Sequence, residues 1–304
     1  MRFALKHAAL VAACMAAFPA YATNGAFLPG FGVKSTGAGG VGIAMPGDTL
    51  SQVANPANAT ETGMRIDLGM TLLNPERTSK VGDSTGLVAD NPSANFGFNQ
   101  GDTSGNTLFL MPDMGFTMPL SESVSLGFAV SGVGGGNTTF KTNIFSSTFW
   151  PNTPNGSVDD LGGVDLMQLI APLTLAYKVN PQHSVGASVN MAVQRFKLNG
   201  AGQFATFGGS GISSDRDHLT NMGYDYSYGG GIKLGWLGKF LDDRVMVGAT
   251  WASRTYMTKF DDYRGLFAEQ GDMDYPENYG IGLTVKPVEN LAISADVVKI
   301  LYSE

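Results

Sequence analysis

The chain contains nine stretches in which apolar and polar residues alternate with a period of two. In residues 64–72, methionine, isoleucine and leucine alternate with arginine, aspartate, glycine and threonine. Successive side chains of a β-strand point to opposite faces, so this pattern places the apolar side chains of each stretch on one face. A helix would mix the two kinds of residue. We predict strands at residues 64–72, 107–119, 124–131, 164–179, 184–194, 226–238, 244–256, 278–285 and 290–302.

The connections between these stretches alternate in length. Four are short and turn-like, at residues 119–123, 180–183, 242–243 and 286–290. Four are long and rich in Gly, Asn, Asp, Ser and Thr, at residues 74–106, 132–163, 196–225 and 257–277. Tight turns on one side and long loops on the other are typical of a transmembrane β-barrel, whereas such long loops are uncommon in compact soluble domains.

The predicted fold class is therefore all-β: a transmembrane, antiparallel, up-and-down β-barrel in a bacterial outer membrane. A closed barrel leaves no backbone group unpaired in lipid. The alternative is a water-soluble β-sandwich, whose strands also alternate. A sandwich does not explain the regular order of short and long connections, and it favours more charge than the 15% of charged residues in this chain.

Residues 1–22 have the features of an export signal. A basic start is followed by an apolar run at residues 8–18 and by a small-residue cleavage pattern at residues 20–22. The apolar run is too short to span a bilayer. We expect the mature chain to begin at Thr23, and the alternative is a buried N-terminal helix.

Cys14 is the only cysteine, and it lies within the predicted signal. The mature protein would then have no disulfide and no thiol chemistry. Residues 11–14 also look like a lipoprotein processing site, which would make Cys14 a lipidated N-terminus. Removing Arg2 and Lys6 from the 19 basic residues leaves 17, against 26 acidic ones. A chain this acidic, with no basic cluster, is a poor candidate for binding nucleic acid.

Residues 23–60 do not alternate, and they are dense in Gly and Ala, with large apolar side chains near their start. The segment is too long for a simple tail and too apolar for a disordered one. We expect it to fold inside the barrel as a plug, with residues 61–304 forming the barrel.

Within the predicted plug, a Gly/Ala-rich run at residues 37–44 is followed by Asp48 and then by the tripeptide Asn55, Pro56 and Ala57. This arrangement resembles the N-terminal hatch of the FadL-type outer-membrane transporters, in which an Asn-Pro-Ala motif lies just before the first strand. Further along, two segments resemble later strands of the same family, at residues 276–279 and 296–303. The resemblance implies that the tripeptide is the hatch motif.

The chain departs from the family pattern in two respects. Members usually carry a pair of acids where this chain has Pro46-Gly47-Asp48. The family's barrel resembles a 14-stranded one, whereas nine strands are predicted here, and an odd number is unusual for a bacterial barrel. Because residues 301–304 end the chain within a strand-like run, we expect a sequence that is truncated at its C-terminus and lacks roughly five strands.

The sequence contains no recognisable catalytic motif. None of the three histidines, His7, His183 and His218, lies on a strand beside a serine and an acid. The glycines of residues 37–42 match GxGxxG, and a dinucleotide site would need a buried strand before them and a helix after them. Here Pro29-Gly30-Phe31-Gly32 precedes the match and Pro46 soon follows it, so a flexible turn of the plug is preferred. We predict a protein that is not an enzyme and that needs no cofactor.

Two acidic pairs occur in the long loops, Asp215 with Asp217 and Asp272 with Asp274. Such pairs could bind Ca²⁺. A solvated, negatively charged loop is the preferred interpretation, and no metal site is predicted.

A barrel with a plug and no energy source is a gated diffusive channel. The resemblance implies passive uptake of long-chain fatty acids or other hydrophobic molecules, with ligand-gated passage past the hatch and lateral exit at a kinked third strand. The alternatives are a general porin for polar solutes and a structural or adhesive barrel. We expect a monomer whose partners are the hydrophobic ligand and outer-membrane lipid.

The predicted ligand-binding residues are of two kinds. Phe27, Leu28 and Phe31 suit an apolar ligand because burying them removes much apolar area from water, although plain packing of the plug is the alternative. Arg65 and Lys233 are on the polar faces of their strands and could hold a carboxylate, or could instead pair with nearby acids.

Three glycines, Gly134, Gly135 and Gly136, directly follow the third alternating stretch. Glycine weakens strand pairing and allows a bend, so these residues are the candidates for the lateral opening. The alternative is an ordinary entry into a loop.

Overall fold

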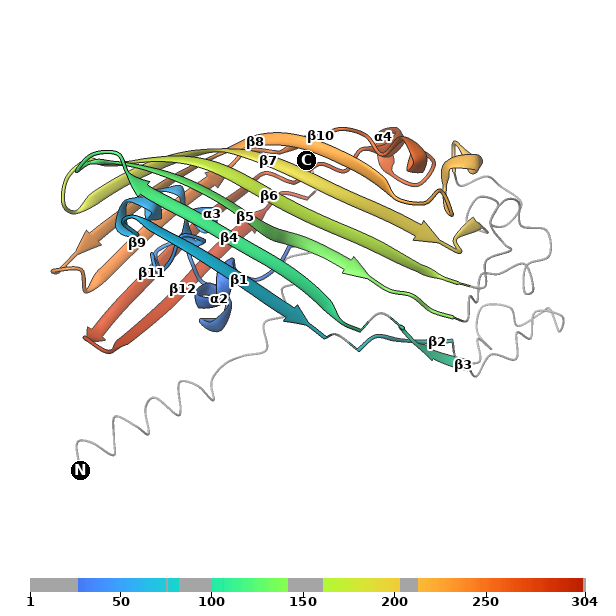
Figure 1. Cartoon of the computed structure of the whole chain (residues 1–304), viewed down its shortest axis with the longest axis horizontal. Coiled ribbons are helices and arrows are strands. Elements are labelled where there is room, and N and C mark those ends of the chain that lie inside the picture. Colours follow the sequence, from blue (N-terminus) through green and yellow to red (C-terminus); the bar gives the residue numbers. More distant parts are fainter. Residues whose placement is uncertain are drawn as a thin grey trace, which may run out of the picture.

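The computed structural model describes residues 27–74, 76–81, 100–105, 107–141, 161–202 and 213–302. Nine strands follow one another along the chain and across one antiparallel sheet (Figure 1). They are β1 (Arg65–Leu73), β4 (Phe109–Pro119), β5 (Val124–Asn137), β6 (Gly163–Lys178), β7 (His183–Asn199), β8 (Asp225–Phe240), β9 (Val245–Ala252), β11 (Asn278–Val288) and β12 (Leu291–Ile300). The predicted antiparallel, up-and-down order is confirmed, whereas the predicted signal, residues 1–22, lies outside the described residues.

Smaller elements lie within the long connections. They are the paired strands β2 (Thr78–Val81) and β3 (Gln100–Thr103), the short strand β10 (Tyr256–Met257), the 3₁₀ helices η5 (Arg216–His218) and η6 (Asp261–Tyr263), and the helix α4 (Ala268–Gly271). The predicted strand 244–256 is too long, because β9 ends at Ala252 and β10 pairs instead with Gly229 and Gly230 of β8.

Several strands extend beyond the alternating stretches. The β6–β7 ladder runs without interruption from Gly163 paired with Asn199 to Lys178 paired with Ser184. At about 3.3 Å per residue, the 17 residues of β7 reach roughly 56 Å, more than a tilted strand needs to cross an apolar band about 25 Å tall. The alternation stops where the strand leaves the apolar band, but the backbone ladder continues.

The two faces of the sheet differ in polarity. On β7, Ser188, Asn190 and Gln194 are buried on the inner face. On the outer face, Val189 and Met191 are 57% and 49% exposed. A large apolar surface facing outward is what a lipid environment requires and what a soluble sandwich would cover.

Residues 27–62, called here the N-terminal segment, lie against the concave inner face of the sheet (Figure 1). The segment contains α2 (Gly32–Gly37), α3 (Ser51–Ala54) and the 3₁₀ helix η1 (Pro56–Glu61). Among the described residues, the sheet is open, and β1 and β12 are its two edge strands. In the same part of the chain, no helix is long and apolar enough to cross a membrane.

Candidate functional site

The predicted hatch motif holds the N-terminal segment to the sheet. The Asn55 side-chain amide donates hydrogen bonds to the carbonyl oxygens of Ile43 and Trp236, at 2.8 and 2.9 Å. Its side-chain oxygen accepts from the backbone N–H of Ala57 at 3.0 Å, which caps η1, and Pro56 occupies the first turn, where no N–H is needed. The fully buried Asn55 therefore ties together two parts of the segment and strand β8.

The antiparallel sheet forms a wall around the N-terminal segment, and a glycine of this wall makes room for the motif. A side chain at Gly235 of β8 would collide with the side-chain oxygen of Asn55. Glycine is thus required at this point because the segment approaches the wall backbone closely.

The Gly/Ala-rich run contacts the edge strand β12 of the sheet. The carboxylate of Asp296, on β12, accepts hydrogen bonds from the backbone N–H groups of Gly42 and Ile43, at 2.7 and 3.0 Å. Asn58 donates to the carbonyl oxygen of Gly42 at 2.9 Å. Among the described residues, the run therefore links α2 to α3 and follows no strand, so it lacks the strand that a dinucleotide-binding GxGxxG turn requires.

Charged residues anchor the end of the segment that leads into β1. The carboxylate of Glu61 contacts the ammonium groups of Lys239 and Lys178, at 2.9 and 3.4 Å. Burial raises the pKa of Glu61, but the hydrogen bond from Lys239 and the charge of Lys178 outweigh it, so the pKa stays below its ordinary value.

Near the middle of the segment, burial and the charge of Asp67 raise the pKa of Asp48.

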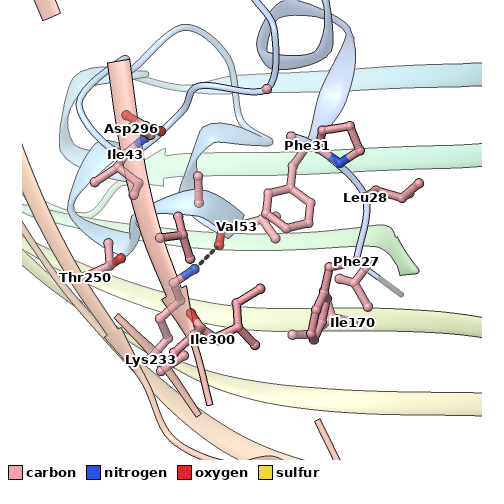
Figure 2. Close-up of a pocket in the computed structure, with 18 of the residues that line it drawn as sticks. Phe27, Leu28, Phe31, Ile43, Val53, Ile170, Lys233, Thr250, Asp296 and Ile300 are labelled. Atoms are coloured by element: carbon pink, nitrogen blue, oxygen red, sulfur yellow. Dashed lines mark hydrogen bonds between the residues drawn. The ribbon is translucent and has the colours of Figure 1, made fainter. Parts of the chain in front are cut away.

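A cavity of about 400 Å³ separates the N-terminal segment from the wall. Most of its lining is apolar, and Figure 2 shows these side chains arranged around one space. They include Phe27, Leu28, Phe31, Val53, Ile170 and Ile300. The volume lies within the usual range for ligand pockets, and the apolar lining favours an apolar occupant. All three apolar residues predicted to bind the ligand therefore line the same cavity.

One cation, Lys233 of β8, enters this apolar cavity. Its ammonium donates a hydrogen bond to the carbonyl oxygen of Val53 at 2.8 Å (Figure 2). Asp296 also lines the cavity, but its carboxylate is occupied by the two N–H groups of the Gly/Ala run. Among the described residues, Lys233 forms no salt bridge. A part-buried ammonium without a carboxylate partner is costly, so an incoming anion would be stabilised there.

Arg65 is not part of this cavity. Its guanidinium pairs with the neighbouring Asp67, with nitrogen–oxygen distances of 2.6 to 2.9 Å, at the start of β1. Asp67 in turn accepts hydrogen bonds from the backbone N–H and the hydroxyl of Thr49, each at 2.9 Å. Arg65 thus supports an anchor of the N-terminal segment, one of the two alternatives that its sequence position left open.

Several lining residues carry no signal in the sequence. Tyr275 lies in a long connection, and its ring packs edge-on against Phe27 with centroids 6.0 Å apart. Asn190 and Thr250 are inward-facing polar residues of their strands, like many others. The alternating pattern places Asn190 and Thr250 on the inner face of the sheet but does not single them out as cavity residues. Nothing in the pattern distinguishes Tyr275.

The predicted lateral opening lies at a break between β4 and β5. Their ladder ends where Met114 pairs with Val130, while β4 continues alongside β1 as far as Phe109. Beyond Val130, β5 remains paired with β6, with an irregularity between Gly132 and Gly134. Gly134, Gly135 and Gly136 therefore belong to β5 and do not begin a loop.

The start of the N-terminal segment occupies the edge that β4 leaves. The backbone N–H of Leu28 donates to the carbonyl oxygen of Val133 at 2.7 Å. Phe27 forms an antiparallel bridge with Gly134. Two residues of the segment thus add a short stretch of strand to β5 beside the cavity.

The acidic loop pairs have partners within the protein. Asp215 contacts His218 at 2.9 Å and the Arg264 guanidinium at 2.6 Å. Hydrogen bonding to His218 and Arg264 lowers the pKa of Asp215 to about 2. Asp274 accepts from the backbone N–H of Met257 at 2.7 Å. No group of three or more potential metal ligands occurs in the part of the chain that the structure describes.

A curved antiparallel sheet with an apolar outer face, an internal N-terminal segment and an apolar cavity between them defines a membrane channel for hydrophobic compounds. Residues 19–304 match the family described as outer membrane protein transport protein (OMPP1/FadL/TodX). The chain belongs to this family of outer-membrane transport channels, which transport hydrophobic small molecules.

Several solved structures share the fold of this chain. The Pseudomonas putida toluene transporter TodX matches with a TM-score of 0.62 and 18% sequence identity, and the match covers 91% of this chain and 71% of TodX. A TodX monoaromatic hydrocarbon channel mutant, deltaS2S3, matches with a TM-score of 0.63 and 18% sequence identity, and the match covers 90% of this chain and 70% of the mutant. A Pseudomonas aeruginosa FadL homologue matches with a TM-score of 0.60 and 14% sequence identity, and the match covers 90% of this chain and 69% of the homologue. A comparison with curated proteins finds no match.

Proposed function

We propose that this protein is a channel for passive uptake of hydrophobic molecules that carry an acidic group, with long-chain fatty acids as the expected substrates. The observation that carries the proposal is Lys233, a cation without a salt-bridge partner among the described residues, in a cavity with an apolar lining. An acyl chain would bury apolar area against Phe27 and Phe31, and its carboxylate would pair with the ammonium.

The substrates named for two of the similar structures, toluene and monoaromatic hydrocarbons, are uncharged. They support a second candidate, neutral aromatic compounds, because the aromatic lining would suit them equally. A neutral compound gains nothing from Lys233, so the lysine favours the acid. A general porin for polar solutes is a poorer fit, because the N-terminal segment and the apolar cavity occupy the inside of the sheet.

In this proposal the N-terminal segment is the hatch, with Asn55, Pro56 and Ala57 as its anchoring motif. The ligand leaves sideways between β4 and β5, near Gly134, once Phe27 and Leu28 release the edge of β5. Among the described residues, a single isolated bridge, which includes the hydrogen bond from Leu28 to Val133, pairs the backbone of the segment with this edge, and this supports its opening before the rest of the segment moves. Residues 1–22 are proposed to be a removable export signal, and the channel is proposed to act as a monomer.

Equilibrium binding of oleate, its methyl ester and toluene to the purified protein tests the substrate class. Charged hydrogen bonds contribute about 1.5–3 kcal/mol, so Lys233→Met should weaken oleate binding by roughly 10- to 100-fold and leave methyl oleate unchanged. Lys286→Met, which removes a lysine near a short turn, is the matched control. If Lys233→Met binds oleate as tightly as the unsubstituted protein, the acidic substrate class is wrong.

A further inference from the structure

A second group of charged and tyrosine residues lies on the outside of the sheet, and none of its members lines the cavity. Its members come from β6, from β7, from the start of β8 and from the residue that precedes β8, and we call them the outer cationic patch: Asp165, Arg195, Lys197, Tyr224 and Tyr226. The strand register brings them together, since Asp165 pairs with Lys197 and Arg195 with Tyr226. All lie at the strand ends that lead to the long connections.

The patch faces the lipid side. Along β7 the buried positions are Ser188, Asn190, Ala192, Gln194 and Phe196, all on the inner face. Arg195 and Lys197 occupy the opposite face, in line with Val189 and Met191. Tyr226, beside Arg195, is 47% exposed.

The height of the patch corresponds to the headgroup region. On the outer face of β7, apolar residues run from Val185 to Val193, and Arg195 and Lys197 follow. Eight residues at about 3.4 Å and a tilt of about 40° give a height of roughly 21 Å, close to the apolar band of about 25 Å. The next outward positions are therefore at the membrane surface. Long loops are on the external side in outer-membrane barrels, so this is the outer leaflet.

The patch carries more positive than negative charge. The Arg195 guanidinium pairs with Asp165 at 3.1 Å and lies 4.5 Å from the ring centroid of Tyr224. The Lys197 ammonium lies 4.9 Å from the centroid of the same ring. The Tyr224 hydroxyl also donates to Asp165, at 2.8 Å. Two cations are thus held against one ring, and the single carboxylate of the patch is already shared between Arg195 and Tyr224.

We infer that the outer cationic patch binds the phosphate group of a lipid in the outer leaflet. Two neighbouring cations repel each other, and a phosphate between them replaces that repulsion with charge-assisted hydrogen bonds. The patch continues directly into the exposed apolar face of β7, where Val193 and Met191 can contact the acyl chains of the same lipid. Tyrosines at the membrane surface complete such a site because one end of the ring is apolar and the other polar.

Titration of the intact protein with diphosphorylated lipid A in nonionic detergent micelles tests this inference. The comparison ligands are the same lipid without phosphates and inorganic phosphate. Each cation near a charged lipid surface contributes about 1 kcal/mol, so Arg195→Gln/Lys197→Gln should weaken lipid A binding by roughly 25-fold. The control Arg244→Gln/Lys286→Gln removes the same charge at the opposite end of the sheet and should bind normally.

Three results would overturn the inference: lipid A binding by the double variant within about twofold of the unsubstituted protein, equal binding of the dephosphorylated lipid, or displacement of the lipid by inorganic phosphate. If the double variant does not fold, Lys197→Gln serves instead, since Lys197 forms no salt bridge among the described residues. It should bind about fivefold more weakly, with recovery in Lys197→Arg. Oleate binding should not change in any of these variants, which separates this site from the cavity.

Discussion

Replacing Asn55 with alanine should release the N-terminal segment while leaving the sheet intact. The substitution removes three hydrogen bonds, to the carbonyl oxygens of Ile43 and Trp236 and from the N–H of Ala57. Asn55 is fully buried, so water cannot replace its amide without opening the structure. A buried group left without its partner costs about 1–3 kcal/mol. With partial relaxation, we expect a total near 3 kcal/mol in the stability of the docked segment.

Hydrogen–deuterium exchange in detergent micelles measures this loss directly. A change of about 3 kcal/mol corresponds to a roughly 150-fold rise in the opening equilibrium, so the amides of Ala57 and Asn58 should exchange faster by about that factor. The amides of the β6–β7 ladder should keep their protection. Asn180→Ala, at an exposed turn where water can replace the lost bonds, should not affect the segment. An increase below about threefold in the segment, or equal loss of protection in β6 and β7, would refute the reasoning.

Two further variants test other contacts of the N-terminal segment. Because the pKa of Glu61 lies below its ordinary value of 4.5, its contribution to stability is present above that pH and is lost as the pH falls through the lowered pKa. Glu61→Gln should therefore lower the thermal midpoint at pH 7, and the difference should shrink as the pH falls below 4.5; a constant difference would contradict the ion-pair account. Leu28→Cys/Val133→Cys, oxidised to a disulfide across the 2.7 Å backbone contact, should take up less oleate into cells than the same variant after reduction, while the purified variant binds oleate equally in both forms. Equal uptake by the oxidised and reduced forms would exclude this edge as the exit.

The strands could be predicted because, in a sheet that faces lipid, every second side chain must be apolar. That requirement ends where the strand leaves the apolar band, so the prediction for β7 ends at Gln194 although the strand continues to Asn199. For the same reason, the alternating pattern ends before Gly134 and leaves a loop entry open as an alternative, whereas backbone pairing with β6 keeps Gly134, Gly135 and Gly136 in β5.

The cavity could be predicted only in part. Phe27, Leu28 and Phe31 stand out as large apolar residues in a Gly/Ala-rich segment, and Lys233 as a cation on an inward face. Arg65 carries the same inward signal, but its partner two residues along the chain, Asp67, keeps it away from the cavity. Tyr275 reaches the cavity from a long connection, whose path depends on tertiary contacts that no local pattern records.

The central claim is that a hydrophobic acid binds between the N-terminal segment and the wall. Photo-crosslinking with a long-chain fatty acid that carries a diazirine near its terminal carbon, followed by mass spectrometry of the labelled peptides, tests it most directly. The account predicts labels at Phe27–Phe31, Ile170 and Tyr275 that excess oleate removes and Lys233→Met weakens. Labels confined to the outward residues of the strands, or labels insensitive to oleate, would contradict it.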